Sequence, residues 1–179
     1  MPVLDHSAKV IRLRFAIAGA PGAGKATLLS RIHALLPPVR RHDIFVQAHG
    51  ADQIASFDFS PPNLIPLGEH LASATLCTAP GRVADPAVWM RVFAGVDALL
   101  FVADSRPARL DDNLAAIREV ASRRQLADVP VVFFHSKTDL PGAMPVAELA
   151  RAINPIGAPF TTDPGAALTA LVGAGFAAA

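Results

Sequence analysis

The chain has little cysteine, little net charge and no long apolar run. Its 179 residues contain one cysteine, Cys77, which excludes an internal disulfide framework and suits a reducing compartment. A formal net charge of +1 gives no general electrostatic reason to bind nucleic acid or an anionic membrane. No stretch reaches the roughly eighteen consecutive apolar residues that a membrane-spanning helix needs.

The first ten residues also lack signals for export or lipid attachment. The opening stretch MPVLDHSAKV has no apolar signal-peptide core, and Pro2 stands where myristoylation requires glycine. We therefore expect a cytoplasmic protein that neither inserts into membranes nor binds nucleic acid. With 52% hydrophobic and 17% charged residues the chain is globular, and its length suits a single domain over residues 1–179.

The most informative stretch covers residues 11–36. An apolar run from Ile11 to Ala18 predicts a buried strand, a glycine-rich turn follows, and apolar residues then recur at helical spacing. Strand, G-x-x-x-x-G-K and helix is the context of a phosphate-binding loop. In such a loop, backbone N–H groups and the helix N-terminus face phosphate oxygens, and the lysine adds a positive charge. The predicted phosphate-binding residues are Gly19, Ala20, Pro21, Gly22, Ala23, Gly24, Lys25, Ala26 and Thr27.

One position of this motif departs from the usual pattern. Ala26 stands where a serine or threonine hydroxyl normally ligates Mg²⁺. Thr27 follows, but adjacent helix positions point about 100° apart, so its hydroxyl does not simply replace the missing ligand. We predict a loop that holds phosphates with a weakened hold on metal, and we keep Thr27 as a candidate ligand.

Strands and helices alternate along the rest of the chain. The predicted strands cover residues 44–48, 71–77, 96–103 and 131–134. The predicted helices cover residues 85–93, 107–126, 146–153 and 164–172. Segment 49–64 mixes glycine, aspartate, serine and proline, so we expect a long loop that contains or precedes an edge strand. Nearly all-apolar strands indicate a mostly parallel sheet covered by helices on both faces, the three-layer α/β fold of P-loop NTPases.

Several stretches together resemble the Ras-like small GTPases, most closely their bacterial gliding-motility and polarity branch, the MglA type. They are GAPGAGKATLL, FDFSP, CTAPGRV, GVDALLFVADS followed by RPARLDDNL, SKTDLP, and INPIGAPF. The resemblance implies a nucleotide switch whose GTP-bound form recruits partners and whose GDP-bound form releases them. It also implies that the loops at 49–64 and 79–92 rearrange, and that effector proteins and a roadblock-type dimeric regulator dock there.

The resemblance assigns guanine recognition to the segment SKTD. Asp139 matches the carboxylate that accepts hydrogen bonds from guanine N1 and N2, and Lys137 matches the lysine whose stem covers the base. Ser136 stands where the family has asparagine, so we expect guanine preference to weaken by on the order of 1 kcal/mol. Thr78 and Gly81, in the third loop, complete the predicted nucleotide-binding positions.

The metal and catalytic positions depart most from the family pattern. Ile54 stands at the switch-threonine position, and Thr78 where most of the family, though not the MglA branch, has aspartate. Asp104 ends an apolar strand and is either a metal ligand or a cap for the helix starting near Pro107. Arg82 replaces the glutamine that orients the attacking water, and a guanidinium only donates hydrogen bonds. We expect GTP and GDP as ligands, compromised Mg²⁺ ligation, and very slow or absent hydrolysis.

Three functions stay open on the sequence alone. The first is a guanine-nucleotide switch in polarity or motility control, and the second is a pseudoGTPase scaffold that keeps the fold without cycling nucleotide. The third, a P-loop ATPase or kinase, is disfavoured because no lid-like arginine segment is present and SKTD points to guanine. Arg82 has two interpretations: a fixed counter-charge to the γ-phosphate that holds a permanently active conformation, or a solvated loop residue.

Overall fold

One sheet organises the chain. The computed structural model describes residues 3–5, 10–49, 52–61, 71–80, 86–123, 128–154 and 156–177. Its strands are β1 (Val3–Asp5), β2 (Val10–Ala18), β3 (Phe45–His49), β4 (Asp52–Phe59), β5 (Leu71–Thr78), β6 (Ala98–Asp104), β7 (Val131–Ser136) and β8 (Phe160–Thr161). They run in the order β3-β4-β5-β2-β6-β7-β8, with β1 paired to β2. The pairs β2–β5, β2–β6, β6–β7 and β7–β8 are parallel, whereas β1, β3 and β4 pair antiparallel.

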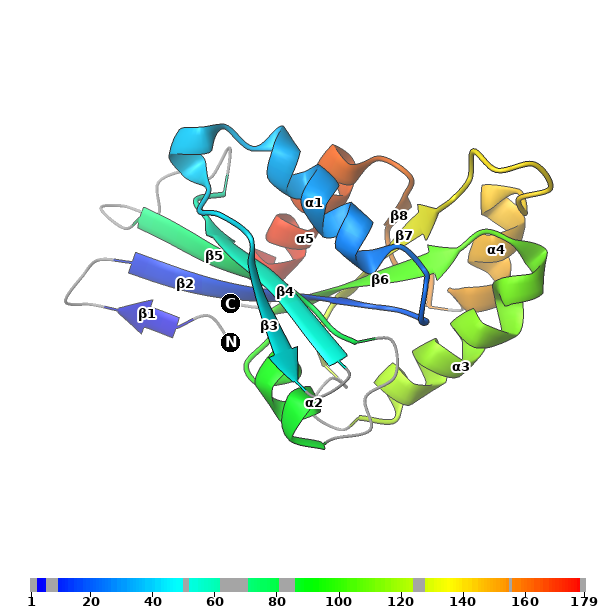
Figure 1. Ribbon diagram of the computed structural model, residues 1–179, viewed down its shortest axis with the longest axis horizontal. Coiled ribbons are helices and arrows are strands. Elements are labelled where there is room, and N and C mark those ends of the chain that lie inside the picture. The colour runs from blue at the N-terminus through cyan, green and yellow to red at the C-terminus, as the bar shows by residue number, and fades with distance from the viewer. Residues whose placement is uncertain are drawn as a thin grey trace.

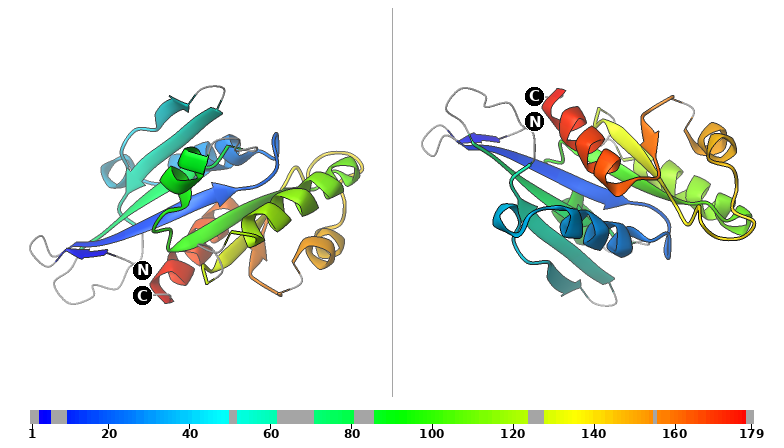
Figure 2. Two further views of the ribbon diagram at one scale, coloured as in Figure 1. Left: turned by 90° about the horizontal axis from the view of Figure 1, so that it is seen from below. Right: turned by 90° about the horizontal axis from the view of Figure 1, so that it is seen from above.

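Helices cover both faces of this sheet. They are α1 (Lys25–Leu35), α2 (Pro86–Phe93), α3 (Leu110–Ala121), α4 (Val146–Ile153) and α5 (Pro164–Ala177), with single 3-10 turns η1 (Pro38–Arg40) and η2 (Pro107–Arg109). α1 and α5 pack with Phe15 and Ile17 on one face, and α2, α3 and α4 pack with Ala16 and Ala18 on the other (Figures 1 and 2). Alternate strand residues point to opposite faces, so a nearly all-apolar strand fills both layers. The predicted three-layer α/β fold is confirmed.

Most predicted elements are confirmed with shifted ends, and one expectation is wrong. Residues 52–59 of the expected loop 49–64 form β4, which lies between β3 and β5 and is not an edge strand. On this side of the sheet the edge strand is β3, and β8 lies at the opposite edge. Phe57 and Phe59 are buried at alternate positions, a strand period that the surrounding polar residues concealed. No helix within the described ranges is long and apolar enough to cross a membrane.

Helix α5 approaches the sheet closely at one glycine. A Cβ atom on Gly175 would lie 2.6 Å from Cε1 and 3.2 Å from Cζ of Phe15, whose side chain is fully buried. Gly173, on the same helix, has no neighbouring atom within 4 Å of the corresponding position. Gly175 therefore sets how near α5 lies to β2, whereas Gly173 does not.

We expect Gly175→Ala to lower the free energy of unfolding by about 1–3 kcal/mol, because the added methyl group overpacks against Phe15. Gly173→Ala is the matched control and should raise that free energy by about 0.5–1 kcal/mol, since alanine is the better helix former. Urea unfolding followed by circular dichroism measures both changes. Two effects of the same sign and size would contradict the close approach.

Candidate functional site

The loops that follow β2, β6 and β7 meet at the carboxyl ends of these parallel strands. In Figure 1 the blue loop between β2 and α1 lies at the same end of the sheet as the loops that leave β6 and β7. The strand register places Asp104, the last residue of β6, beside Ser136, the last residue of β7. Ligands of open α/β sheets bind at this end of the strands, which makes the three loops the candidate site.

Glycines give the loop after β2 its shape. Gly19, Gly22 and Gly24 have φ values of 141°, 71° and 100°, where side chains are disfavoured. A Cβ atom on Gly19 would also clash with the carbonyl oxygen of Val102 in β6. Gly24 precedes α1 without a side-chain cap, so no described side chain takes up the first N–H groups of the helix, and they can face a ligand.

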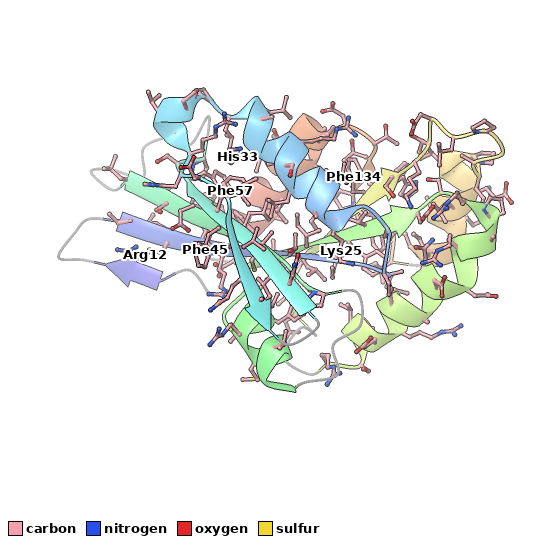
Figure 3. All side chains as sticks on the ribbon, in the orientation of Figure 1. Arg12, Lys25, His33, Phe45, Phe57 and Phe134 are labelled. Carbon is pink, nitrogen blue, oxygen red and sulfur yellow. The ribbon has the colours of Figure 1, made fainter. Side chains whose placement is uncertain are left out.

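The lysine of the motif folds back onto its own loop. Lys25 Nζ donates to the carbonyl oxygens of Gly19 at 2.8 Å and Ala20 at 2.9 Å. Its side chain lies at the start of α1, near the centre of Figure 3, and the residue is 9% exposed. Burial lowers the pKa of Lys25 to about 8. The loop therefore encloses a cation whose desolvation a bound phosphate would offset.

The next three carbonyl groups of the loop are held by side chains from distant segments. Each of these donors reaches across from the loop after β6 or from the end of β7 and the loop that follows it. Arg109 Nη2 lies 2.6 Å from the oxygen of Pro21, Lys137 Nζ 2.6 Å from that of Gly22, and Ser136 Oγ 2.7 Å from that of Ala23. Five consecutive carbonyl oxygens, from residue 19 to residue 23, thus accept a side-chain hydrogen bond.

The Asp104 carboxylate connects the segment after β6 with the turn after β7. Its side chain is fully buried, and Oδ2 lies 2.7 Å from Lys137 Nζ and 2.7 Å from Arg106 Nη2. Oδ1 accepts the backbone N–H of Arg106 at 3.1 Å. Burial alone would raise the pKa of Asp104, but the hydrogen bonds from Arg106 and Lys137 lower it to about 2. The side chain of Asn113 also bonds the backbone of Asp104 in both directions, at 3.1 and 2.9 Å.

The residues predicted as metal ligands are not brought together. Both oxygens of Asp104 accept from basic side chains, and Oδ1 also accepts the backbone N–H of Arg106. Among the described residues neither η2 nor α3 has a side-chain cap, so Asp104 does not form the expected cap. Thr78, predicted as a nucleotide-binding position, uses its hydroxyl within the sheet: it accepts the N–H of Ala55 at 3.0 Å and lies 3.3 Å from the carbonyl oxygen of Ala55. Thr27 is exposed on α1. Within the described ranges, no three His, Cys, Asp or Glu side chains form a metal-binding group.

The remaining predicted residues divide into two groups. Asp139 lies exposed in the turn after β7, and its carboxylate has no hydrogen-bond partner in the part of the chain that the structure describes. Gly81 and Arg82 lie outside the described residues. Sequence reasoning missed Arg109, because its contact with Pro21 spans 88 positions and leaves no local pattern.

We expect Asp104→Asn to destabilise the protein by about 2 kcal/mol at neutral pH, because the paired carboxylate is lost. The folded-state pKa lies below the ordinary value of 3.8, so the stabilisation is complete above that value and disappears as the pH falls through about 2. Urea unfolding of both proteins between pH 2 and 7 measures the difference. A gap that stays constant with pH would contradict the ion-pair account.

Known proteins resemble this chain in sequence and in structure. The ADP-ribosylation factor family matches residues 81–156. The mutual gliding-motility protein MglA of Myxococcus xanthus (strain DK1622) is 28% identical over 161 residues, which cover 86% of this chain and 82% of that protein. ADP-ribosylation factor-like protein 13B of Chlamydomonas reinhardtii is 27% identical over 143 residues, which cover 79% of this chain and 24% of that protein.

One solved structure illustrates the fold. The Arl6 BBS3 small GTPase of Trypanosoma brucei, with bound nucleotide analogue GppNp, superposes with a TM-score of 0.63 at 18% identity. The superposition covers 94% of this chain and 99% of that one. The predicted resemblance to Ras-like small GTPases and their MglA branch is confirmed, and the fold is that of the small GTPases.

Proposed function

We propose that the protein binds guanine nucleotides and works as a small GTPase-like regulatory switch. The loop between β2 and α1 carries this proposal. Its carbonyl oxygens from residue 19 to residue 23 all accept side-chain hydrogen bonds, while no side chain among the described residues caps the first N–H groups of α1. Together with the buried ammonium group of Lys25, this arrangement is suited to the phosphates of a nucleotide.

The turn after β7 supports guanine as the base. Lys137 Nζ and Ser136 Oγ both bond the phosphate loop, so the turn that carries Asp139 is fixed relative to that loop. The exposed Asp139 carboxylate can accept two N–H donors from one edge of a guanine. The Ser136 hydroxyl lies within hydrogen-bond distance of Ala23 O and Ala103 O, so it serves the loop and leaves base recognition to Asp139.

We place this switch in the cytoplasm, in polarity or motility control, by analogy with the gliding-motility relative. The partners we propose are effector proteins and a roadblock-type dimeric regulator. Their docking surface would include the edge strand β3, where Phe45 and Val46 are 64% and 53% exposed. Large apolar side chains exposed on an unpaired strand edge are typical of protein–protein contacts.

A pseudoGTPase scaffold is the second candidate, and the buried Ile54 favours it. Its side chain is 7% exposed within the apolar cluster on the α2 side of the sheet, at the position where the resembled family has the switch threonine. A buried isoleucine supplies no oxygen to a metal ion. This alternative keeps the partner surface and gives up the nucleotide cycle.

Nucleotide identity separates the candidate functions. We expect denatured, freshly purified protein to release GDP or GTP, and titration with fluorescent nucleotides to favour both over ATP. Asp139→Asn should weaken GDP binding at least about tenfold, because the amide cannot accept both donors of the base. Asp111→Asn, an exposed carboxylate on α3, is the control and should bind GDP normally. Release of no nucleotide together with no titration signal would favour the scaffold, and ATP would favour an ATPase.

Hydrolysis tests the degenerate catalytic positions. We expect bound GTP to turn over more slowly than about 10⁻⁴ s⁻¹, since Arg82 cannot accept a hydrogen bond from the attacking water. Phosphate release under single-turnover conditions, with chromatography of the bound nucleotide, gives the rate. A rate equal to that of a GTPase with the usual glutamine would show that another group orients the water.

A further inference from the structure

We infer that basic side chains of the protein hold the phosphate loop in its binding conformation, and that the loop binds a nucleoside diphosphate without a divalent metal ion. The inference rests on the proposed function, because it concerns the same loop. It separates two properties that small GTPases combine, namely phosphate binding and Mg²⁺ binding.

The residues at the expected metal positions do not fit a metal ion. Ala26 has no side-chain oxygen, and Ile54 is buried among apolar side chains. The Thr78 hydroxyl engages both the N–H and the carbonyl group of Ala55, so ligating a metal would cost the end of the β4–β5 pairing. Mg²⁺ binds oxygen ligands in a near-octahedral arrangement, which these three positions do not supply.

Asp104 does not fill the gap. Its Oδ2 already lies 2.7 Å from the ammonium group of Lys137 and 2.7 Å from the guanidinium group of Arg106. A metal ion would have to displace both cations from a fully buried carboxylate. The pairing explains why Asp104 is buried at all, because an unpaired buried carboxylate is strongly destabilising.

The loop has its own source of positive charge. Four basic side chains belong to the contact network around it, and two carboxylates accept from them. The basic residues are Lys25, Arg106, Arg109 and Lys137, and the acidic ones are Asp104 and Asp112. Four positive and two negative side chains give this network a net charge of +2, and Lys25 is the member without a carboxylate partner within it. Neutralising phosphate charge is one of the tasks that Mg²⁺ performs in this fold class, and fixed cations perform it too.

Arg109 is the tether that the resemblance did not suggest. Arg109, the last residue of η2, donates from Nη2 to Pro21 O at 2.6 Å, while its Nη1 pairs at 2.7 Å with Oδ2 of Asp112 in the first turn of α3. Asp112 thus orients the guanidinium group toward the loop. Arg109 acts on the ligand through the main chain of the phosphate loop, which makes it a positioning residue.

The metal requirement is tested on the unaltered protein. After bound nucleotide is removed, fluorescent GDP is titrated in excess Mg²⁺ and, separately, in excess EDTA. We expect dissociation constants that agree within about threefold. A loss of more than about thirtyfold in EDTA would overturn the inference and leave the proposed function intact. No binding in either buffer would overturn both.

The role of Arg109 in holding the phosphate loop is tested by substitution. Arg109→Ala should weaken GDP binding about tenfold in both buffers, because one charged hydrogen bond to the loop is lost. Arg109→Lys keeps a donor and should recover part of the affinity, a rescue that a general loss of stability would not show. Arg118→Ala is the matched control, since Arg118 is exposed on α3 and makes no side-chain hydrogen bond within the described residues.

Thermal unfolding accompanies each titration, so that an unfolded variant is recognised. If Arg109→Ala does not fold, the comparison of Arg109→Lys with the unaltered protein still reports on the tether. Full GDP affinity in a folded Arg109→Ala protein would overturn the claim that Arg109 holds the phosphate loop in its binding conformation.

Discussion

The ion pairs of the buried Asp104 carboxylate are the interaction on which the site depends. A fully buried charge is tolerated only when it is paired and hydrogen-bonded, and Arg106, Lys137 and the turn after β6 meet that need. Lys137 does not stop at the carboxylate, because its ammonium group also bonds Gly22 O. One strand end therefore joins the segment leading to α3, the turn after β7 and the phosphate loop.

The shape of the phosphate loop is consequently a property of the fold rather than of a ligand. A loop held at five carbonyl groups loses little conformational freedom when an anion arrives, which favours binding. The same restraints make this loop a poor element for a two-state switch, which needs a segment with two accessible arrangements. The β3 edge of the sheet is less restrained, because among the described strands β3 pairs with β4 alone and exposes Phe45 and Val46.

Much of this architecture could be predicted from the sequence, because periodicity and glycine placement are local signals. The apolar run of residues 11–18 predicted β2, and the helical spacing of the apolar residues after the glycine-rich turn predicted α1. The strand expected within or after residues 49–64 could not be given bounds or its interior place in the sheet, since half of residues 52–59 are polar and their pairing partners lie elsewhere in the chain. Strand β1, of three residues, is too short to show any period.

The site was harder to predict than the fold, and for a physical reason. In sequence, a strand-end aspartate that caps a helix, ligates a metal or pairs with basic side chains looks the same, and only its partners in the structure show that Asp104 does the last. No local sequence pattern marks Arg109 as a site residue, because the carbonyl group that it contacts, that of Pro21, lies 88 positions away.

The loss of metal-binding side chains and the presence of basic tethers fit one physical account. Phosphate binding needs two things from this end of the sheet: N–H groups pointing inward, and positive charge nearby. Backbone geometry supplies the first, and it depends on Gly19, Gly24 and the held carbonyl groups rather than on any metal. The second can come from an ion or from side chains. Here the Thr78 hydroxyl bonds Ala55 of β4, and Asp104 pairs with two cations, so neither is available to a metal ion. Basic side chains are then the source of the positive charge. The hydroxyl that Ala26 lacks would ligate Mg²⁺, and the rest of the site no longer supplies the other ligands for that ion. Alanine at this position therefore leaves phosphate binding intact.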